Sequence, residues 1–422
     1  MPPMTVANLS RGFRCLVGAQ FLGAFNDNLF KQLILFLAAG MLFPGKDMQG
    51  LAFAVFSLPF VLFSGVAGDL SERFSKRSII VSMKWTEIGV MLLGAWALQS
   101  QNWTFLLVTL FLMGAQSAIF GPSKYGSIPE LVEPQQLLQA NGTIAMTTFL
   151  AVLLGQAIAG PLMDRFGQQL WQPGAFCVAF AVVGTFISVG IHHLPPQKPN
   201  LSILLNPFGR LWNTVGMLRD TDGLLTIVLL NSLFWFNGSV LNQAIVSLGE
   251  PAYLAIGPGE KSLLSYILVT LSLSIILGSL LAPGVARHIG AGRTALFGGI
   301  AMIAGQCALV LIGPVFNHHN HGIYVTHCII AWVGLTGALF VVPIQSFMQH
   351  GPPPGSRGQT FAVNNFLNFA FMFLGGLYYL LARRPAFDIG PTIAQCLAAG
   401  VMLSVLVAKR RAVLAIRMER SP

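Results

Sequence analysis

The stretch FNDNLFK, residues 25–31, places an acid, a base and two amides within a run that is apolar enough to cross a membrane. Asp27 and Lys31 are four residues apart, so on a helix they share one face, and Asn28 shares part of it. Asn26 points elsewhere. An ionisable side chain in the middle of a membrane helix is by default a functional-site hypothesis. We therefore predict that Asn26, Asp27, Asn28 and Lys31 bind a polar ligand, the alternative being an internal structural pair.

A second cation lies in the stretch GPSKYG, residues 121–126. Gly121 and Pro122 are expected to interrupt the preceding helix, and a broken helix end can present a cation and backbone groups to an anion. We predict that Lys124 and Tyr125 contribute to the same binding site. The alternative is that Lys124 only anchors the helix at the membrane surface.

The second half of the chain carries amides where the first half carries charges. Amides inside membrane helices are expected to face other helices or a cavity. Substrate contact and interhelical hydrogen bonding are both open for each cluster. The residues predicted to contact a substrate are Asn231, Trp235, Asn237, Gln345, Asn364 and Asn368.

Composition indicates which elements must position these residues. The 422-residue chain is 54% hydrophobic and 9% charged, with a mean hydropathy of +0.70, whereas soluble domains are about 25% charged. Apolar runs of about 20 residues, each long enough to span a bilayer, recur along it. We predict an all-α polytopic membrane protein with spans over residues 14–43, 49–69, 78–98, 103–122, 141–161, 174–192, 223–246, 262–282, 294–315, 323–343, 360–381 and 391–408.

The net charge of +10 follows the membrane topology and does not indicate nucleic-acid binding. Basic residues occur in short clusters between the apolar runs, as the positive-inside rule predicts. With the N-terminus in the cytoplasm, 17 of the 24 Lys and Arg residues fall on the cytoplasmic side and five on the other. Both termini are therefore expected in the cytoplasm.

The spans are predicted to form two pseudo-symmetric bundles of six helices. A hydrophilic, proline-rich connection divides them into residues 1–192 and 223–422, with a linker over 193–222. Part of that connection, 201–218, is expected to act as a plain tether, the alternative being an amphipathic helix that lies on the membrane. Sequence echoes between the halves, such as FN at 25–26 and 236–237, indicate duplication, which is usual in secondary transporters.

The stretch GDLSERFSKR, residues 68–77, resembles the loop signature of the major facilitator superfamily, and this resemblance implies that superfamily's fold. An acid within a basic cluster could form a charge relay that latches the two halves on the cytoplasmic side and breaks during transport. A solvated basic loop is the alternative. The predicted gating residues are Gly68, Asp69, Glu72, Arg73, Lys76 and Arg77.

No sequence pattern of enzymatic chemistry is found. The five cysteines show no disulfide framework or metal-binding spacing. The histidines of NHHNHGIYVTH, residues 317–327, are expected in a solvated outer loop and not on a metal. With no nucleophile–base pair and no nucleotide loop, we predict a protein that is not an enzyme and that has no cofactor or metal.

The combination of FLGAFNDNLFK, AGDLSERFSKR and GAQSAIFGPSKYGSIPELV resembles the bacterial lysophospholipid transporter family. The resemblance implies a flippase that moves lysophosphatidylethanolamine and lysophosphatidylglycerol inward across the inner membrane of Gram-negative bacteria. It also implies re-acylation of this cargo by a separate acyltransferase/acyl-carrier-protein synthetase. By motif it assigns Asn26, Asp27, Asn28, Lys31, Lys124 and Tyr125 to the site.

Transport by alternating access is expected from a monomer whose partners are its substrate and membrane lipids. Two other functions are compatible with the sequence. One is a facilitator that exports drugs or other amphiphiles, because spacing does not indicate direction. The other is a non-transporting scaffold for an acyltransferase, against which the charged residues in the first span argue.

Overall fold

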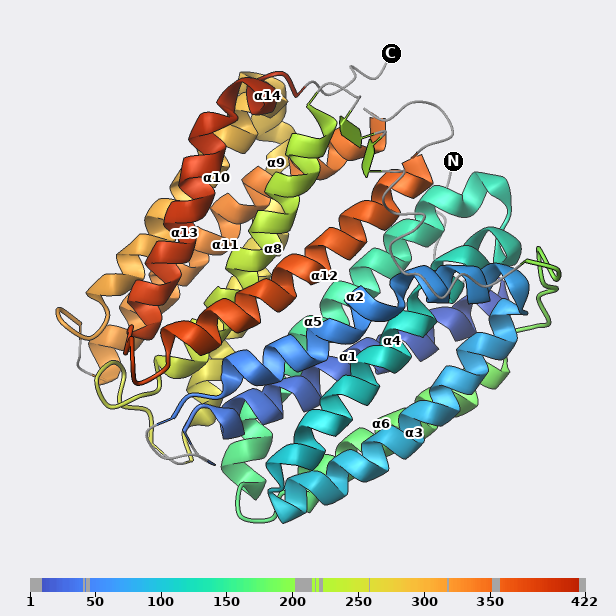
Figure 1. Ribbon diagram of the computed structural model, residues 1–422, viewed down its shortest axis with the longest axis horizontal. Helices are drawn as coiled ribbons and strands as arrows, with labels where there is room; N and C mark the ends of the chain where they lie inside the picture. The colour runs from blue at the N-terminus through green and yellow to red at the C-terminus, as the bar shows by residue number, and fades with distance from the viewer. Residues whose placement is uncertain are drawn as a thin grey trace. The chain divides into compact units, whose positions relative to one another are not determined.

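The computed structural model is almost entirely helical, and Figure 1 shows its helices in chain order. The structure describes residues 10–40, 42, 46–201, 215–216, 218–219, 223–257, 259–316, 319–350 and 357–416. Most of segment 201–218, expected to be a tether or an amphipathic helix, lies outside these residues. Within the described ranges the only extended pairings are two isolated bridges, one of which joins Ala39 to Asp47.

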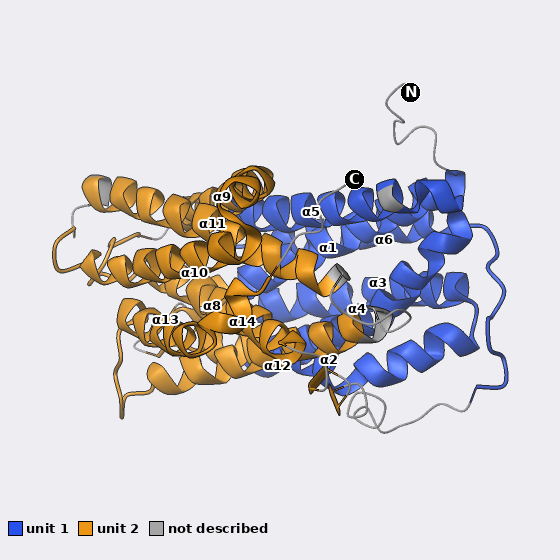
Figure 2. Ribbon diagram, turned by 90° about the horizontal axis from the view of Figure 1, so that it is seen from above, with its two compact units in different colours: residues 1–34, 55–209 blue, residues 35–54, 210–422 orange. Residues whose placement is uncertain are grey.

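The helices fall into two compact units, coloured separately in Figure 2. Unit 1 comprises Met1–Ile34 and Val55–Gly209, and unit 2 comprises Leu35–Ala54 and Arg210–Pro422. The helices with most of their length in unit 1 are α1 (Arg11–Ala38), α2 (Gln49–Arg73), α3 (Lys76–Ser100), α4 (Trp103–Leu131), α5 (Leu137–Phe166) and α6 (Trp171–Val189). Segment 35–54, which joins α1 to α2, belongs to unit 2.

Unit 2 contains the later helices of the chain. They are α8 (Leu224–Ser247), α9 (Lys261–Ile289), α10 (Ala291–Ala308), α11 (His319–His350), α12 (Arg357–Ala382), α13 (Pro391–Ala408) and the short α14 (Arg410–Leu414). Its principal packing is of α9 and α10 on α11, and of α12 and α13 on α8.

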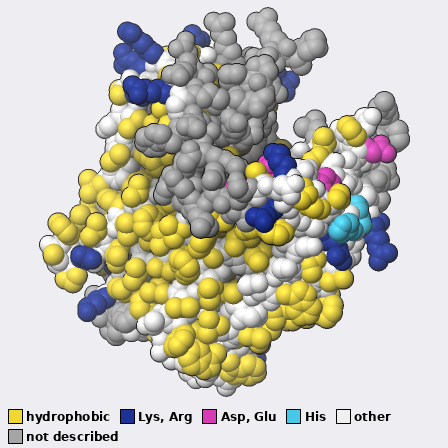
Figure 3. Space-filling model, turned by 45° about the vertical axis from the view of Figure 1, so that its right-hand side comes forward, with side chains coloured by type: hydrophobic (Ala, Val, Ile, Leu, Met, Phe, Trp, Pro, Cys, Tyr) yellow, Lys and Arg dark blue, Asp and Glu magenta, His cyan; other side chains and the backbone are white. Residues whose placement is uncertain are grey.

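The helices have the length and composition of membrane spans. Eleven helices within the described residues are long and apolar enough to cross a bilayer. The 28-residue α1 is not among the eleven, and it carries Asp27 and Lys31 in its middle. Hydrophobic side chains cover much of the face shown in Figure 3. Among the described residues, Phe186 and Leu280 are two of the most exposed large hydrophobic side chains. Such a surface is stable in lipid, so the chain is a multi-pass membrane protein.

Two predicted helix ends are wrong in ways that affect the site. α4 was expected to end at residue 122, but it continues through Pro122 and Pro129 to Leu131. Proline is tolerated in membrane helices because neighbouring groups satisfy the freed carbonyls. α2 was expected to end at residue 69, but it continues to Arg73, so Phe74 and Ser75 alone separate it from α3.

Close packing of α5 on α1 fixes the middle of α1. A Cβ atom built on Gly155 would lie 2.6 Å from the carbonyl oxygen of Phe25 and 3.1 Å from Cβ of Asn28. Glycine therefore lets the two backbones approach, as small residues do between membrane helices. This contact holds the FNDNLFK segment against α5 within unit 1.

Candidate functional site

The candidate site in unit 1 is built around Asp27 on α1. The Ser117 hydroxyl of α4 donates a short hydrogen bond to Oδ2 of Asp27, and it also lies 3.1 Å from Oε1 of Gln116. The other carboxylate oxygen, Oδ1, is buried, and no described residue donates a hydrogen bond to it. A buried carboxylate oxygen without a donor is costly, so it is an expected position for a ligand that donates hydrogen bonds.

Lys31 lies one turn further along α1. Its Nζ donates to Oδ1 of Asn28 at 3.0 Å and lies 5.1 Å from the ring centroid of Phe56 on α2. Asn28 in turn donates to the carbonyl oxygen of Ala24. The ammonium group is therefore held between an amide oxygen and an aromatic face, an arrangement that stabilises a desolvated cation. Asp27, Asn28 and Lys31 all lie in α1, and their contact with a ligand stays a prediction.

Asn26 lies on a different face of α1 and is fully buried. Its Nδ2 donates to Oε1 of Glu87 on α3 at 3.2 Å and to the carbonyl oxygen of Cys177 on α6 at 3.1 Å. Glu87 forms a short ion pair with Lys84, in which both side chains are 1% exposed. These contacts join α1, α3 and α6. The Oδ1 of Asn26 is buried and has no donor among the described residues, so its contact with a ligand stays a prediction.

Glycines make room for the buried ion pair. A Cβ atom on Gly184 of α6 would lie 2.8 Å from Nζ of Lys84, and one on Gly23 of α1 would lie 3.4 Å from it. The paired charges are therefore enclosed between three helices. This supports a structural role for the pair.

Lys124 and Tyr125 lie in the continuous helix α4 and not at a broken helix end. Nζ of Lys124 lies 4.5 Å from the ring centroid of Tyr125, which is an exposed side chain. Since α4 is not interrupted at Pro122, it presents no free backbone groups of a broken helix end there. What the structure retains is a cation that is held over an aromatic ring on the same helix as Ser117.

The second-half amides form a hydrogen-bonded cluster within unit 2. Nδ2 of Asn231 on α8 donates to Oδ1 of Asn364 at 2.9 Å and to Oδ1 of Asn368 at 3.1 Å, both on α12. Ser232 donates to the same Asn368 oxygen. If the Asn368 amide is turned over, its oxygen lies 3.2 Å from Nε1 of Trp235. Interhelical hydrogen bonding is thus visible for this group, and its contact with a substrate stays a prediction.

The other two predicted residues of unit 2 lie apart from this cluster. Asn237 is buried, and its Nδ2 donates to the carbonyl oxygen of Leu233 and contacts Sδ of Met402 at 3.5 Å. Its Oδ1 has no donor among the described residues. Gln345 is an exposed side chain on α11.

The predicted gating residues have partners within unit 1. Oε2 of Glu72 pairs with Nζ of Lys198 at 2.6 Å, and Nζ of Lys76 pairs with Oε1 of Glu130 at 2.6 Å. Nε of Arg77 donates to the carbonyl oxygen of Ile191, just after the end of α6. Arg73 lies over the ring of Phe74.

The two remaining gating residues lie on the last turns of α2. Asp69 is buried, and a Cβ atom on Gly68 would meet nothing within 4 Å. Among the described residues, Gly68 therefore has open space beside it and no close packing partner. The role of the six residues in gating stays a prediction.

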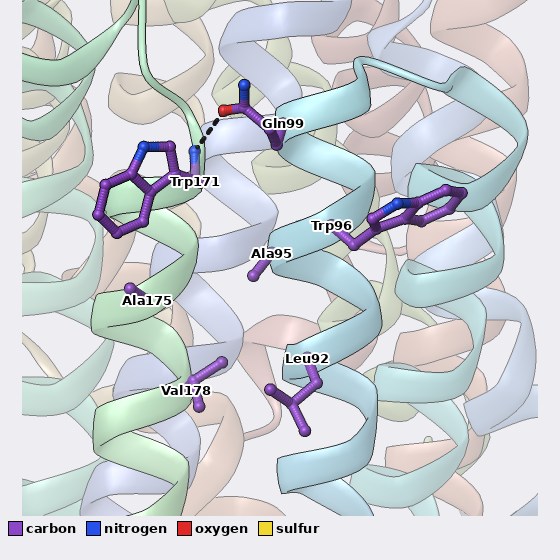
Figure 4. A pocket seen from close by; sticks show the side chains of 7 residues that line it. All are labelled: Leu92, Ala95, Trp96, Gln99, Trp171, Ala175 and Val178. Carbon is purple, nitrogen blue, oxygen red and sulfur yellow. Dashed lines mark hydrogen bonds between the residues drawn. The ribbon is translucent and has the colours of Figure 1, made fainter.

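A groove on unit 1 lacks the charged side chains found at the candidate site. It lies between α3 and α6 and has a volume of about 400 Å³ (Figure 4). Its one polar side chain, Gln99, accepts a hydrogen bond from the backbone N–H of Trp171 at 3.1 Å. No charged residue lines it. The residues lining it are Leu92, Ala95, Trp96, Gln99, Trp171, Ala175 and Val178.

The family model of the Major Facilitator Superfamily matches residues 16–376 of the chain. The chain belongs to the Major Facilitator Superfamily. This confirms the fold class expected from the sequence.

Curated relatives of this facilitator match over nearly their full length. It is 28% identical over 411 residues to the lysophospholipid transporter LplT of Photorhabdus laumondii, with 94% of each chain covered. It is also 28% identical over 397 residues to LplT of Escherichia coli O139:H28, with 90% of this chain and 92% of that one covered.

Solved structures of other transporters share the fold of this facilitator. A peptide transporter POT in complex with sulfate gives a TM-score of 0.72 at 14% identity, with 99% and 98% of the two chains covered. A bacterial homologue of the iron transporter ferroportin in an inward-facing state gives a TM-score of 0.70 at 14% identity, with 96% and 100% covered.

Two contacts of the candidate site, those of Ser117 and Phe56, were not predicted from the sequence. Ser117 was not singled out, because a serine in an apolar run is common and its distance from Asp27 in sequence hides their contact. Phe56 was one of 32 phenylalanines, and nothing in its spacing indicated that it faces Lys31. The one usable signal for Ser117 is its neighbour Gln116, since two adjacent polar residues are unusual within a span.

Proposed function

We propose that this facilitator moves lysophospholipids inward across the bacterial inner membrane, for re-acylation by a separate acyltransferase. The observation that carries the proposal is the Asp27, Asn28 and Lys31 segment, in which Lys31 is buried and the buried Oδ1 of Asp27 has no donor among the described residues. Near-full-length similarity to transporters named for lysophospholipids supports this class of cargo.

The charges of the site suit a zwitterionic head group. The ammonium group of Lys31 would bind the phosphate, and Oδ1 of Asp27 would accept a hydrogen bond from an ethanolamine ammonium or a glycerol hydroxyl. Charge-assisted hydrogen bonds of this kind are stronger than neutral ones. Lys124 offers a second cation on α4. The membrane core opposes passage of the charged head, and these groups would replace its hydration.

Aromatic residues of α2 offer a surface for the single acyl chain. Phe56, Phe60 and Phe63 are spaced at i, i+4 and i+7, so they lie along one face of the helix. The rings of Phe56 and Phe60 are 5.6 Å apart, and Lys31 lies over the first of them. A head group bound at Lys31 would thus have an apolar stripe beginning beside it.

Alternating access would then expose the site first to one side of the membrane and then to the other. The predicted cytoplasmic latch at residues 68–77 would bias this equilibrium. The second-half amides Asn231, Asn364 and Asn368, together with the indole of Trp235, would contribute contacts if their mutual hydrogen bonds exchange for substrate.

The test is transport in vesicles that contain only this protein and labelled lysophospholipids, with head group and number of acyl chains varied. We expect transport of one-chain lipids, with Asp27→Asn and Lys31→Ala abolishing it while the protein still folds. Asp388→Asn is a matched control, because this exposed residue has a φ of 42° that asparagine tolerates. Normal rates for both site variants would show the assignment to be wrong.

The same assay separates the alternatives. A scaffold would move nothing in vesicles that lack its partner. An exporter would move drugs or other amphiphiles outward and would not accept lysophospholipids.

A further inference from the structure

A cluster of polar side chains joins residues 35–54 to α8 and α12. We call residues 35–54 the hairpin; it comprises the end of α1, the connection and the start of α2. Asp47 lies in the hairpin and is 8% exposed. Its Oδ2 accepts a hydrogen bond from the Ser247 hydroxyl at the end of α8, at 2.7 Å, and lies 3.4 Å from Nε of Arg383. The same Arg383, just after α12, forms a short ion pair with Glu250. All of these residues belong to unit 2.

Two further side chains complete the cluster. Gln49 donates from Nε2 to Oδ2 of Asp47 at 3.1 Å and to Oγ of Ser247 at 2.8 Å. The Tyr379 hydroxyl donates to the same Ser247 oxygen at 2.7 Å. Ser247 is thus a shared contact of the hairpin, α8 and α12. We name this group the hairpin cluster: Asp47, Gln49, Ser247, Glu250, Tyr379 and Arg383.

Next to the cluster, the backbone of α2 closely approaches the backbone of α12 at two glycines. A Cβ atom on Gly376 of α12 would lie 2.7 Å from the backbone nitrogen of Ala54 and 2.8 Å from the carbonyl oxygen of Gly50. Two glycines therefore form a smooth contact between α2 and α12. Such a surface can separate without moving side chains past one another.

The hairpin lies in the first half of the chain but is grouped with the helices of the second half. Residues 35–54 cluster with unit 2, whereas the rest of α1 and α2 clusters with unit 1. A part of two helices that carry the candidate site is therefore attached to α8 and α12 by hydrogen bonds, ion pairs and a glycine contact. Any movement that carries α1 and α2 away from unit 2 must first break these bonds.

We propose that the hairpin cluster is a releasable latch, which opens and closes in each transport cycle, with Arg383 as its central residue. The proposal rests on the proposed function, because it assigns gating residues to alternating access. Three observations favour release over permanent bracing. The bonds are polar and can exchange for water; water reaches the 13% exposed Arg383 and 29% exposed Glu250 side chains; and Oε1 of Gln49 has no donor among the described residues.

The first test needs no substrate, so its outcome does not depend on whether lysophospholipids are the cargo. Ala54→Cys, 2% exposed and opposite Gly376, would report opening through its rate of reaction with a membrane-impermeant maleimide added outside. Arg383→Gln leaves Asp47 without its cation, and we expect it to raise the rate at least ~10-fold. Arg384→Gln, the same change at the exposed neighbour, should leave the rate within about two-fold. Equal rates in all three proteins would overturn the latch.

The second test keeps Arg383 and traps the latch. Gln49→Cys and Ser247→Cys, in a chain without other cysteines, would be joined by a one-carbon bis-methanethiosulfonate spacer that a reductant removes. We expect transport to fall to background when joined and to recover on reduction. As a control, natural Cys307 and Cys396, whose sulfur atoms are 3.1 Å apart within unit 2, can be joined instead, and transport should persist. Transport by the joined 49–247 protein at its reduced rate would overturn the latch.

Discussion

Asp27 uses its two carboxylate oxygens differently. Oδ2 accepts the Ser117 hydroxyl, which fixes the orientation of the carboxylate, and Oδ1 faces no donor among the described residues. Glu87, which holds helices together, has both oxygens bonded through Lys84 and Asn26, whereas Glu130, which pairs with Lys76, also has one buried oxygen without a donor among the described residues. What sets Asp27 apart is that its unbonded oxygen lies on the segment of α1 that also carries Lys31, and this combination is our residue-level reason for proposing a binding role.

Ser117→Ala should weaken transport without abolishing it. A hydrogen bond to a charged group contributes about 1.5–3 kcal/mol, and each 1.4 kcal/mol is tenfold. We therefore expect the apparent KM for lysophospholipid uptake to rise ~10–100-fold, because the carboxylate loses its orientation. Thr109→Ala on the same helix is the control, since Thr109 donates only to the carbonyl oxygen of Phe105 in its own helix. An unchanged KM in Ser117→Ala would mean that Asp27 needs no positioning by α4.

The latch should respond to pH through Glu250. Burial raises the pKa of Glu250 above its ordinary value, and Asp47 and Asp388 add to the rise, while Arg383 opposes it. Nearby Tyr253 stays neutral in this range, because burial and then Glu250 raise its pKa as well. A carboxyl group with a higher pKa in the latched than in the released state binds more protons when latched, so acidification favours the latch.

The expected result is slower maleimide reaction at Ala54→Cys as pH falls from neutral toward about 4.3, the ordinary pKa of glutamate. Glu250→Gln, measured in the same background, controls for titration of the thiol itself and should remove the additional slowing. If both proteins show the same pH profile, Glu250 does not report on the latch.

At the scale of helices, the sequence predicted the number and approximate position of the spans but not their ends or faces. Hydropathy locates apolar runs, and α13 was predicted with the observed limits. Hydropathy cannot show that α4 continues through Pro122, because neighbouring helices decide whether a proline breaks a membrane helix. The charges in FNDNLFK indicated the candidate site in α1, whereas Ser117 and the hairpin cluster depend on contacts between residues 90 to 336 positions apart in sequence.

Gly155→Ala should disturb the site through helix packing alone. The added Cβ atom would lie 2.6 Å from the carbonyl oxygen of Phe25, so α5 and α1 must separate. Overpacking of this kind costs about 1–3 kcal/mol, and the shift moves Asn28 and its bond to Lys31. We expect a lower apparent melting temperature in detergent and reduced transport. Gly142→Ala on the same helix meets nothing within 4 Å and should change neither measurement. Equal behaviour of the two variants would refute the packing argument.

At the scale of the molecule, the candidate site and the latch occupy different units of the same chain. The FNDNLFK segment lies in unit 1, while residues 35–54, which begin four residues after Lys31, lie in unit 2. Binding at Lys31 and release of the hairpin would thus act on one continuous helix, α1. A rigid α-helix transmits displacement along its axis, which is the physical basis on which we expect ligand binding and latch opening to be coupled.

The orientation of the molecule is predicted from charge and can be tested across a single helix. Arg384 precedes α13 and Arg410 follows it, and both are exposed. The 18 residues of α13 rise about 27 Å at 1.5 Å each, close to the thickness of the hydrocarbon core. The two arginines must therefore lie on opposite sides of the membrane. Since 17 of 24 basic residues favour the same side as Arg410, we place Arg410 in the cytoplasm. In spheroplasts, an impermeant maleimide should react with Arg384→Cys and reach Arg410→Cys only after the membrane is opened with detergent. The reverse pattern would invert the predicted direction of transport. It would also exchange the sides of the membrane assigned to residues 68–77 and to the hairpin cluster.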